Sequence, residues 1–238
     1  MHFSDKGIII SKKPLKENSY IVTVFTQSHG IYSGVLKQYS KKTGDRLVEG
    51  NLVDFAWHAR LHEHLGSVKI ELIRSYNSYL LLNKMKLYAF NSAISLLKKS
   101  FGEREPHNSL FPFLLSFLES LKKAFSFQHY IHLELAILSE AGYKLQLDHC
   151  IVTGQQDNLY YVSPKSGQAV SKAAGDPYSN KLLRLPQFLL DDVKLTSPML
   201  QDAFTLTSYF FNRYIFVGQE IPLSRNYFCQ YAIDVLNQ

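Results

Sequence analysis

The stretch that decides the fold is residues 18–46, NSYIVTVFTQSHGIYSGVLKQYSKKTGDR. Within it, residues 20–26 are almost all β-branched or aromatic, a composition that favours a half-buried strand over a helix. Gly30 marks a turn, and a second apolar run, residues 31–36, follows after a short connection. The spacing predicts that the two runs pair as a β-hairpin.

Beyond the hairpin the chain becomes cationic. The turn at residues 43–45 is surrounded by four bases and contains one acid, and the bases are Lys37, Lys41, Lys42 and Arg46. Such a loop on a curved sheet suits a phosphate backbone, although composition alone favours an ordinary solvated loop equally. Tyr39 stands inside the loop and is our preferred candidate for stacking on a base. We expect most of the aromatics on the predicted strands to lie in the core and one or two of the set to face a groove. Besides Tyr39, the set contains Tyr20, Phe25, Tyr32 and Trp57.

Three further strands are predicted around the hairpin. Residues 7–11 form the first, which we expect to end at Lys12-Lys13-Pro14 because proline cannot donate to a central ladder. Residues 52–61 and 67–73 form the fourth and fifth. Five strands within about 75 residues suit a small closed barrel of the OB type, and an SH3-like barrel fits the count nearly as well. We assign residues 1–78 to this barrel domain.

The remainder, residues 79–238, is predicted to be a helical domain, which makes the fold class α+β. One helix is expected at residues 83–99 and another at residues 130–138. Between them, a helix is expected to begin after a cap at Asn108 or Ser109. Two more should begin at Ser197-Pro198 and at Ser224. Residues 148–180 interrupt this pattern with turns and two short strand-like runs, 159–162 and 168–170.

Charge and cysteine content narrow the function classes. The net charge is +6, and residues 1–80 carry 11 Lys and Arg against 7 Asp and Glu. This balance is consistent with a polyanionic partner. No signal peptide or membrane-length apolar run is present, so we expect a cytoplasmic protein with reduced Cys150 and Cys229.

No motif for catalysis or cofactor binding emerges. His58, His62 and His64 invite a metal hypothesis, but they lack the one-face spacing of a helical zinc site. A polar strand end or a histidine beside a phosphate explains them better. The two cysteines show no nucleophile arrangement, and no phosphate-binding glycine loop occurs. The expectation is therefore a non-enzyme without cofactor or metal.

Three groups of residues, taken in order, resemble the RecO family of bacterial recombination mediators. The first is ENSY at 17–20 with Gly30 before the basic loop; the second is Glu134-Leu135 with Gly142-Tyr143. The third is CIVTG at 150–154, YVSP at 161–164, SGQAVS at 166–171 and AGDPY at 174–178. The resemblance implies an OB domain, a helical domain and a zinc-ribbon-like insertion. It also implies DNA repair by strand annealing and recombinase loading, without catalysis.

Metal-binding members of that family carry four cysteines in the insertion. Here Cys150 is retained, while Thr153, Ser171 and Ala174 stand at the other three positions, so we expect the insertion to lack zinc. Packing of apolar side chains should hold it instead: Ile151, Tyr160, Tyr161 and Val162.

The resemblance also implies the partners. These are single- and double-stranded DNA, RecR and the C-terminal tail of the single-stranded-DNA-binding protein, with RecF and RecA further along the pathway. His132 stands where relatives carry a basic residue that helps neutralise the acidic tail, and an ordinary helix-surface residue is the alternative interpretation. A competing hypothesis is a non-catalytic adaptor whose barrel binds no DNA.

Overall fold

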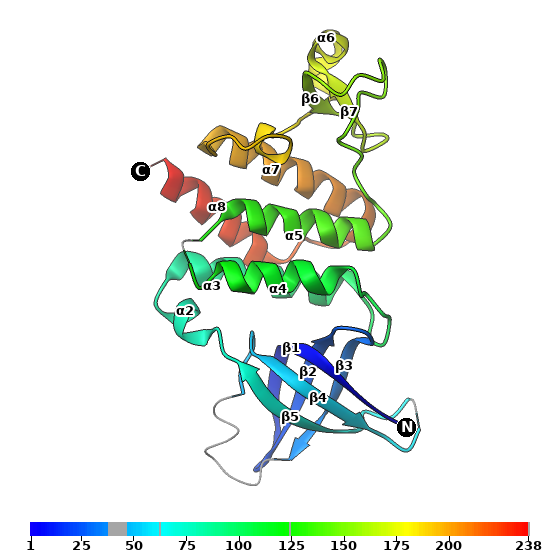
Figure 1. The fold of residues 1–238 in the computed structure, drawn as a ribbon, viewed down its shortest axis with the longest axis vertical. Coiled ribbons are helices and arrows are strands. Elements are labelled where there is room, and N and C mark those ends of the chain that lie inside the picture. Colours follow the sequence, from blue (N-terminus) through cyan, green and yellow to red (C-terminus); the bar gives the residue numbers. More distant parts are fainter. Residues whose placement is uncertain (38–46, 62, 124, 238) are drawn as a thin grey trace. The chain divides into compact units, whose positions relative to one another are not determined.

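The computed structural model describes residues 1–37, 47–61, 63–123 and 125–237 (Figure 1). Contacts between Cα atoms divide the chain into two compact units. The first comprises Met1–Phe90 and Leu97–Phe125, and the second comprises Asn91–Leu96 and Ser126–Gln238. Each unit is described by itself.

The first unit contains a closed five-stranded barrel with the strand order β1-β2-β3-β5-β4. Its strands are β1 (His2–Lys16), β2 (Ser19–Thr26), β3 (Gly30–Lys37), β4 (Leu52–His58) and β5 (Ser67–Arg74). β1 pairs antiparallel with both β2 and β4, and a parallel contact between Val35 and Ser67 joins β3 to β5. These pairings close the ring and confirm the expected OB-type barrel.

The predicted hairpin is confirmed, and its pairing follows from side-chain alternation. β2 and β3 pair from Ser19↔Lys37 to Thr26↔Gly30. Alternate residues of both strands, such as Val22, Val24 and Tyr32, enter the buried core of the barrel. Gly30 has a φ of +79°, and a Cβ at this position would lie 1.8 Å from the carbonyl oxygen of Glu105. Only glycine therefore fits this turn.

Two strand ends differ from the sequence prediction. β1 continues through Pro14 to Lys16. The prediction that Pro14 ends the strand was wrong because β1 pairs with β4 only as far as Ile8, so beyond that residue it has a neighbour on one side alone. The fourth strand, in turn, stops at His58 instead of residue 61.

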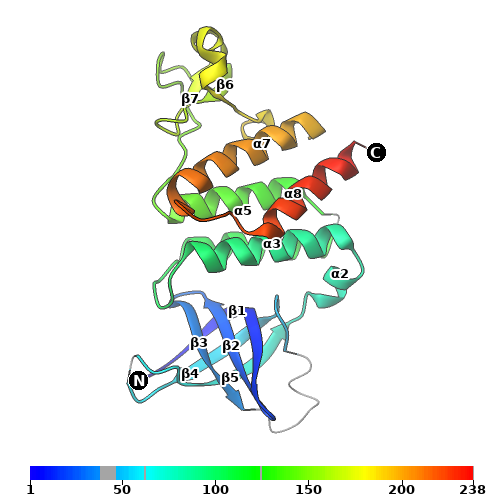
Figure 2. The same cartoon turned by 180° about the vertical axis from the view of Figure 1, so that it is seen from behind.

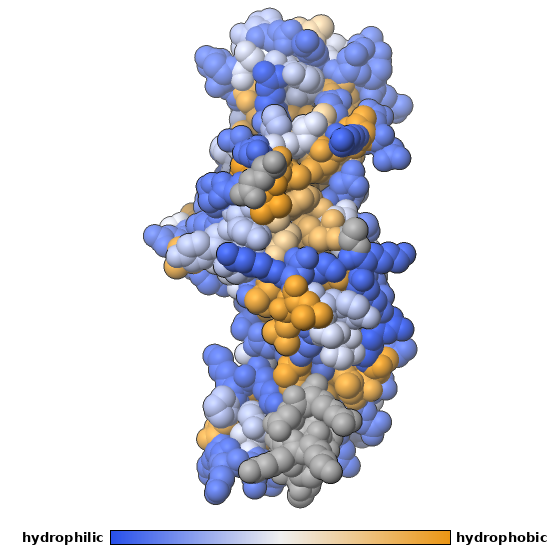
Figure 3. Space-filling view, turned by 90° about the vertical axis from the view of Figure 1, so that its left-hand side faces the viewer, coloured by the Kyte–Doolittle hydropathy of each residue, from blue (hydrophilic) through white to orange (hydrophobic). Residues whose placement is uncertain are grey.

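The first unit also contains α2 (Asn77–Leu81) and α4 (Leu110–Ser120). The helix α3 (Lys84–Ser100) is divided, since its residues Asn91–Leu96 belong to the second unit. Asn83 caps α3, since its side-chain oxygen accepts a hydrogen bond from the Lys86 amide at 3.1 Å. The sequence did not predict α2, which is a single short turn. Tyr79, Leu81 and Leu82 around it are exposed, and apolar surface is visible on the face that carries α2 (Figure 3).

The main helices of the second unit are α5 (Phe127–Glu140), α7 (Ser197–Phe210) and α8 (Leu223–Leu236) (Figure 2). The helix predicted to begin at Ser197-Pro198 ends at Phe210 and continues as one π-helical turn, η3 (Phe211–Ile215). Thr196, not Ser197, caps α7. Pro222 occupies the N-cap of α8, and the hydroxyl of Ser224 is buried without a hydrogen bond, so the cap expected at Ser224 was wrong.

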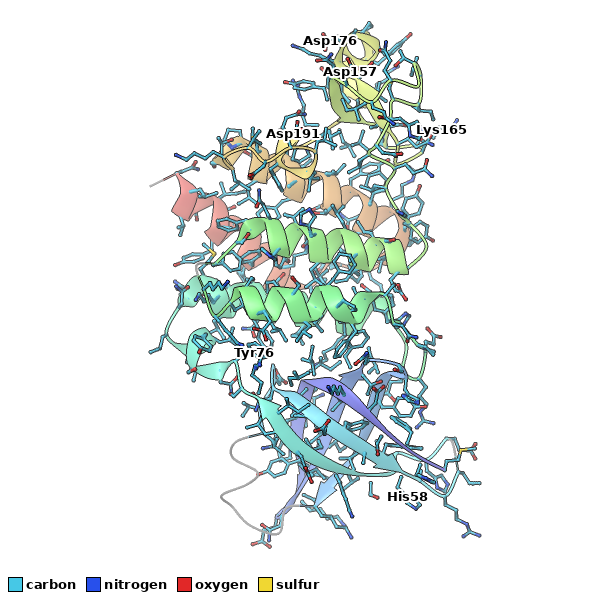
Figure 4. All side chains as sticks on the ribbon, viewed as in Figure 1. His58, Tyr76, Asp157, Lys165, Asp176 and Asp191 are labelled. Atoms are coloured by element: carbon cyan, nitrogen blue, oxygen red, sulfur yellow. The ribbon has the colours of Figure 1, made fainter. Side chains whose placement is uncertain are left out.

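The insertion carries a three-stranded sheet in the order β7-β6-β8, and Figure 4 labels Asp157, Lys165 and Asp176 on this part of the chain. Its elements are β6 (Leu159–Val162), β7 (Ala169–Ser171), α6 (Lys172–Gly175), η1 (Asp176–Lys181) and β8 (Leu183–Arg184). A 3₁₀ turn, η2 (Gln187–Leu189), follows. Tyr161 and Val162 are buried as predicted, whereas Ile151 is 46% exposed and does not contribute to the core.

No helix in the described part of the chain is both long enough and apolar enough to span a membrane.

Candidate nucleic-acid interface

Three exposed lysines lie close together at one end of the barrel. Lys16 pairs with Ser19 across β1 and β2, and Ser19 pairs with Lys37 across β2 and β3. Lys13, opposite Ile21, lies a few residues back along β1. We call Lys13, Lys16 and Lys37 the cationic edge. Because neighbouring strands are about 5 Å apart, the backbones of Lys16 and Lys37 lie roughly 10 Å apart across three strands.

Sequence reasoning found only one of these three lysines. Lys37 was predicted to contact phosphate, and it lies exposed at the last residue of β3. Lys13 and Lys16 were missed because the first strand was expected to stop before Pro14. The pairing of Lys16 with Ser19 depends on the full length of β1, which periodicity did not reveal. The other predicted DNA contacts lie outside the described residues: Tyr39, Lys41, Lys42 and Arg46.

A groove of about 290 Å³ lies on the outer face of β1, β2 and β3 beside the end of α3. Its apolar lining includes Ile21 and Phe101, and Lys13 and Lys98 also contribute to its walls. The hydroxyl of Ser33 donates to Glu103 Oε1 at 2.6 Å and contacts the hydroxyl of Thr23 at 2.9 Å. The groove therefore joins an apolar surface to the cationic edge through Lys13.

The strand aromatics are mainly core, as expected. Phe25, Tyr32 and Trp57 are all less than 10% exposed, and the indole of Trp57 donates to the carbonyl of Leu65 at 3.0 Å. Tyr20 is the exception among the described candidates. It is partly exposed, its ring packs against the barrel core, and the ammonium group of Lys12 lies 4.2 Å from the ring centroid.

Two of the three histidines of the metal hypothesis, His58 and His64, lie in the described part of the chain. His58 ends β4 and is exposed, with its position labelled in Figure 4, and His64 is exposed in the following turn. His62 lies outside the described residues. Within residues 1–37, 47–61, 63–123 and 125–237, no group of three His, Cys, Asp or Glu side chains is arranged to hold a metal ion.

In the insertion, one pair of the four zinc-ligand positions keeps a spacing close to that of zinc ligands, although three of the four cysteines are replaced. Cys150 Sγ lies 3.5 Å from Ser171 Oγ and accepts a hydrogen bond from the Ser171 amide at 3.1 Å. Two sulfurs on one tetrahedral zinc lie about 3.8 Å apart, given Zn–S bonds of about 2.3 Å. The spacing of Cys150 and Ser171 is close to this value, yet one thiol, two hydroxyls and the methyl of Ala174 do not fit a structural zinc ion. Burial opposes ionisation of Cys150, but hydrogen bonds from Ser171 and Thr153 lower the pKa of its thiol.

His132 lies exposed on α5. Partial desolvation of its ring and the nearby His129 lower the pKa of His132 below its usual 6.5. The imidazole is consequently mostly neutral at pH 7, which weakens it as a partner for an acidic segment compared with arginine or lysine.

A buried ion pair that joins α5 to α8 was not predicted from the sequence. Arg225 Nε donates to Glu134 Oε1 at 2.6 Å, and Arg225 Nη2 donates to Glu134 Oε2 at 3.0 Å. Tyr130 and Thr207 also donate to the carboxylate. Ninety-one residues separate the pair along the chain, so no local pattern reveals it.

The fold and the cationic edge together define a class of protein. A closed OB-type barrel with cations gathered at one end, joined to a helical domain, is typical of proteins that bind nucleic acids. Comparisons with known proteins specify the family within this class. Residues 1–76 match the family "Recombination protein O N terminal", and residues 85–219 match "Recombination protein O C terminal".

Relatives agree over nearly the whole chain. The DNA repair protein RecO of Rickettsia felis is 54% identical over 235 residues, covering 98% of this chain and 99% of the relative. That of Rickettsia akari is also 54% identical with the same coverage. That of Rickettsia canadensis is 53% identical over 234 residues, covering 98% and 97%. The chain belongs to the RecO family, which assigns it a role in DNA repair and recombination.

Proposed function

We propose that the protein is a recombination mediator that binds single- and double-stranded DNA, anneals complementary strands and helps to load recombinase. Its DNA substrate is coated by the single-stranded-DNA-binding protein, and the mediator itself performs no catalysis. The observation that carries this proposal is the register that brings Lys16 and Lys37 together beside Ser19. The chain that leaves β3 at Lys37 then supplies three more bases and Tyr39 by residue 46.

The physical task of annealing explains the need for such a surface. Two polyanions approach each other only when their phosphates are neutralised, and lysine contacts to phosphate provide this without reading sequence. A single strand also exposes its bases. The apolar wall of the groove near Lys13 offers them a surface. Tyr39, in the segment that follows Lys37, is the candidate for stacking on a base.

Partner contacts form the second part of the proposal. RecR and the acidic tail of the single-stranded-DNA-binding protein are the expected direct partners, with RecF and RecA acting in the same pathway. His132 is the candidate contact for the tail. Its lowered pKa predicts a weaker contact at neutral pH than a permanently charged residue would give.

A strand-annealing assay tests the proposal directly. The triple variant Lys13→Ala, Lys16→Ala, Lys37→Ala should anneal complementary strands more slowly than wild type. The matched control is Lys165→Ala, Lys181→Ala, Lys194→Ala, which removes three exposed lysines from the second unit and should anneal normally. Equal annealing by both variants would remove the cationic edge from the mechanism.

The adaptor hypothesis makes a different prediction for the wild-type protein. An adaptor would bind RecR or the tail but would bind no DNA even at low salt, where phosphate contacts are strongest. Measuring both affinities on one preparation separates the two functions.

A further inference from the structure

A cluster of aromatic rings and one arginine lies on the second unit and shares no residue with the cationic edge. The rings of Tyr143 and Tyr214 are stacked, with centroids 4.2 Å apart and an interplanar angle of 13°. Phe210 lies nearly parallel to Tyr214 at 6.1 Å, and Phe210 itself is buried. The three rings form a column whose outermost member, Tyr143, is 36% exposed.

Two irregular pieces of backbone hold this column in place. Gly142, with a φ of +92°, follows α5 and allows the Tyr143 amide to donate to the Leu138 carbonyl at 2.8 Å, as in a Schellman turn. Tyr214 lies in the π-helical turn η3. Such turns are rare in proteins as a whole, and those that occur are often found at functional sites. The stack thus depends on the local geometry at two helix ends.

Arg213 adds an exposed positive charge beside the column. Its guanidinium carbon lies 5.4 Å from the ring centroid of Tyr214 and 5.9 Å from that of Tyr209. Arg213 Nη1 donates to the hydroxyl of Tyr209 at 2.9 Å. Because guanidinium has five N–H donors, this bond leaves donors that point to solvent or to an anion. A planar cation fixed beside an aromatic face suits one nucleotide, with its base on the ring and its phosphate on the arginine.

A groove begins at the residue after Tyr143. It has a volume of about 620 Å³ and is lined by residues 144–149 together with Leu189 and Leu190. Lys144 contributes a second cation at its start. Its acidic group, Asp148, lies 3.1 Å from the Nδ1 atom of His149. Its size falls within the usual range of ligand sites, about 300–1,000 Å³.

We propose that Tyr143, Arg213 and the adjoining groove form a second binding site for single-stranded nucleic acid, in which a base stacks on Tyr143 and the neighbouring phosphate contacts Arg213. This inference rests on the proposed DNA binding but uses none of the barrel residues. An exposed ring at the end of a stack requires an unpaired base, so the site selects single strands over duplexes.

The test compares full-length variants in binding to a single-stranded oligothymidylate and to an abasic strand of equal length. Tyr143→Ala should weaken binding of the base-bearing strand by about fivefold or more, the low end of the effect of losing one base stack. It should leave the abasic strand unaffected, whereas a purely structural role would weaken both alike. Tyr143→Phe, which keeps the ring, should bind both strands as wild type does.

Two further variants test the contact between Arg213 and a phosphate and the effect of removing an exposed tyrosine elsewhere on the second unit. Arg213→Gln should reduce the slope of log K against log salt by about 0.7, the value for one phosphate contact on a single strand. Tyr227→Ala removes a tyrosine that is 69% exposed on α8 and should change nothing. Ultraviolet crosslinking of a 5-iodouracil strand should label Tyr143 in the wild-type protein.

The outcomes distinguish this site from the proposed function itself. Wild-type binding that Tyr143→Ala and Arg213→Gln leave unchanged would overturn the second site, for example in favour of a protein partner, and would leave the barrel's role intact. No binding of single strands by the wild type would overturn both. Selective loss in Tyr143→Ala, even when Lys13, Lys16 and Lys37 are already alanine, would support the second site independently of the barrel.

Discussion

Arg225 binds Glu134 through two hydrogen bonds in the core of the second unit, and both side chains are at most 2% exposed. Thr207 connects the two, since its hydroxyl donates to Glu134 Oε2 at 2.6 Å and accepts from Arg225 Nη2 at 2.9 Å. Tyr130 completes the set by donating to Glu134 Oε1 at 2.7 Å. This network joins α5, α7 and α8, so it fixes α5, which carries His132, and α7, which continues into η3 with Arg213.

Breaking the ion pair should strongly destabilise the protein. Arg225→Ala leaves the Glu134 carboxylate buried without its cation, which typically costs about 3–5 kcal/mol. Urea denaturation measures the loss. Arg74→Ala is the matched control because Arg74 pairs with Glu119 at an exposed site, where a salt bridge contributes under about 1 kcal/mol. Comparable losses in the two variants would show that the buried pair is not special.

Glu119 should make acid stability pH-dependent. Although burial opposes its ionisation, hydrogen bonds from Lys122, Tyr76 and Arg74 hold the pKa of Glu119 at about 2, against 4.5 in an unfolded chain. A lowered folded-state pKa stabilises the fold above pH 4.5, and this contribution disappears as the pH falls from about 4.5 to 2. Its size is limited because the Glu119 side chain is 37% exposed.

Glu119→Gln should therefore lower the melting temperature at pH 6 and have little effect near pH 2. Thermal unfolding followed at both pH values measures the difference. A variant whose melting temperature is lowered equally at both would contradict the assignment. Tyr76, labelled in Figure 4, donates to the same carboxylate, so Tyr76→Phe should reproduce part of the effect.

Gly30 should tolerate no side chain. Gly30→Ala forces a Cβ against the Glu105 backbone in addition to the strain of a positive φ. Gly154 has a similar φ of +73°, but a Cβ added there would meet no atom within 4 Å, so Gly154→Ala should cost only the conformational term of about 1–2 kcal/mol. Chemical denaturation of both variants isolates the steric part. Equal losses would mean that the Glu105 segment moves aside freely.

The zinc content of the protein tests the loss of three zinc-binding cysteines from the insertion. Purified protein should contain no stoichiometric zinc, since a single thiolate at Cys150 does not hold the ion. Thr153→Cys, Ser171→Cys, Ala174→Cys restores four thiols around a pair of positions already 3.5 Å apart and should bind one zinc ion. Elemental analysis of both proteins gives the answer, and one zinc ion in the wild type would contradict the prediction.

Much of the fold was predictable from the sequence because local signals agreed. β-branched runs on either side of Gly30 predicted the hairpin, and the Asn83 cap preceded a clear helical period. Tertiary context explains the errors. Pro14 is tolerated because its strand has one neighbour there, and Ser224 does not cap α8 because the helix already begins at Leu223, with Pro222 at the N-cap.

The candidate sites were less predictable than the fold. The approach of Lys16 to Lys37 depends on pairing across three strands, and the Tyr143–Tyr214 stack joins residues from two distant helix ends. Neither arrangement leaves a periodic trace in the chain. Only the chemistry of the residue types, basic and aromatic, was visible beforehand.

The central claim is that the cationic edge and the basic segment after it bind DNA through phosphates. The most direct measurement is the single-strand affinity at several salt concentrations for wild type and for the variant Lys13→Ala, Lys16→Ala, Lys37→Ala. Each lost phosphate contact lowers the slope of log K against log salt by about 0.7, so we predict a decrease of about 2. Extending the change to Lys41, Lys42 and Arg46 should flatten the slope further, without creating any sequence preference. A folded triple variant with the wild-type salt slope would contradict phosphate binding by the cationic edge.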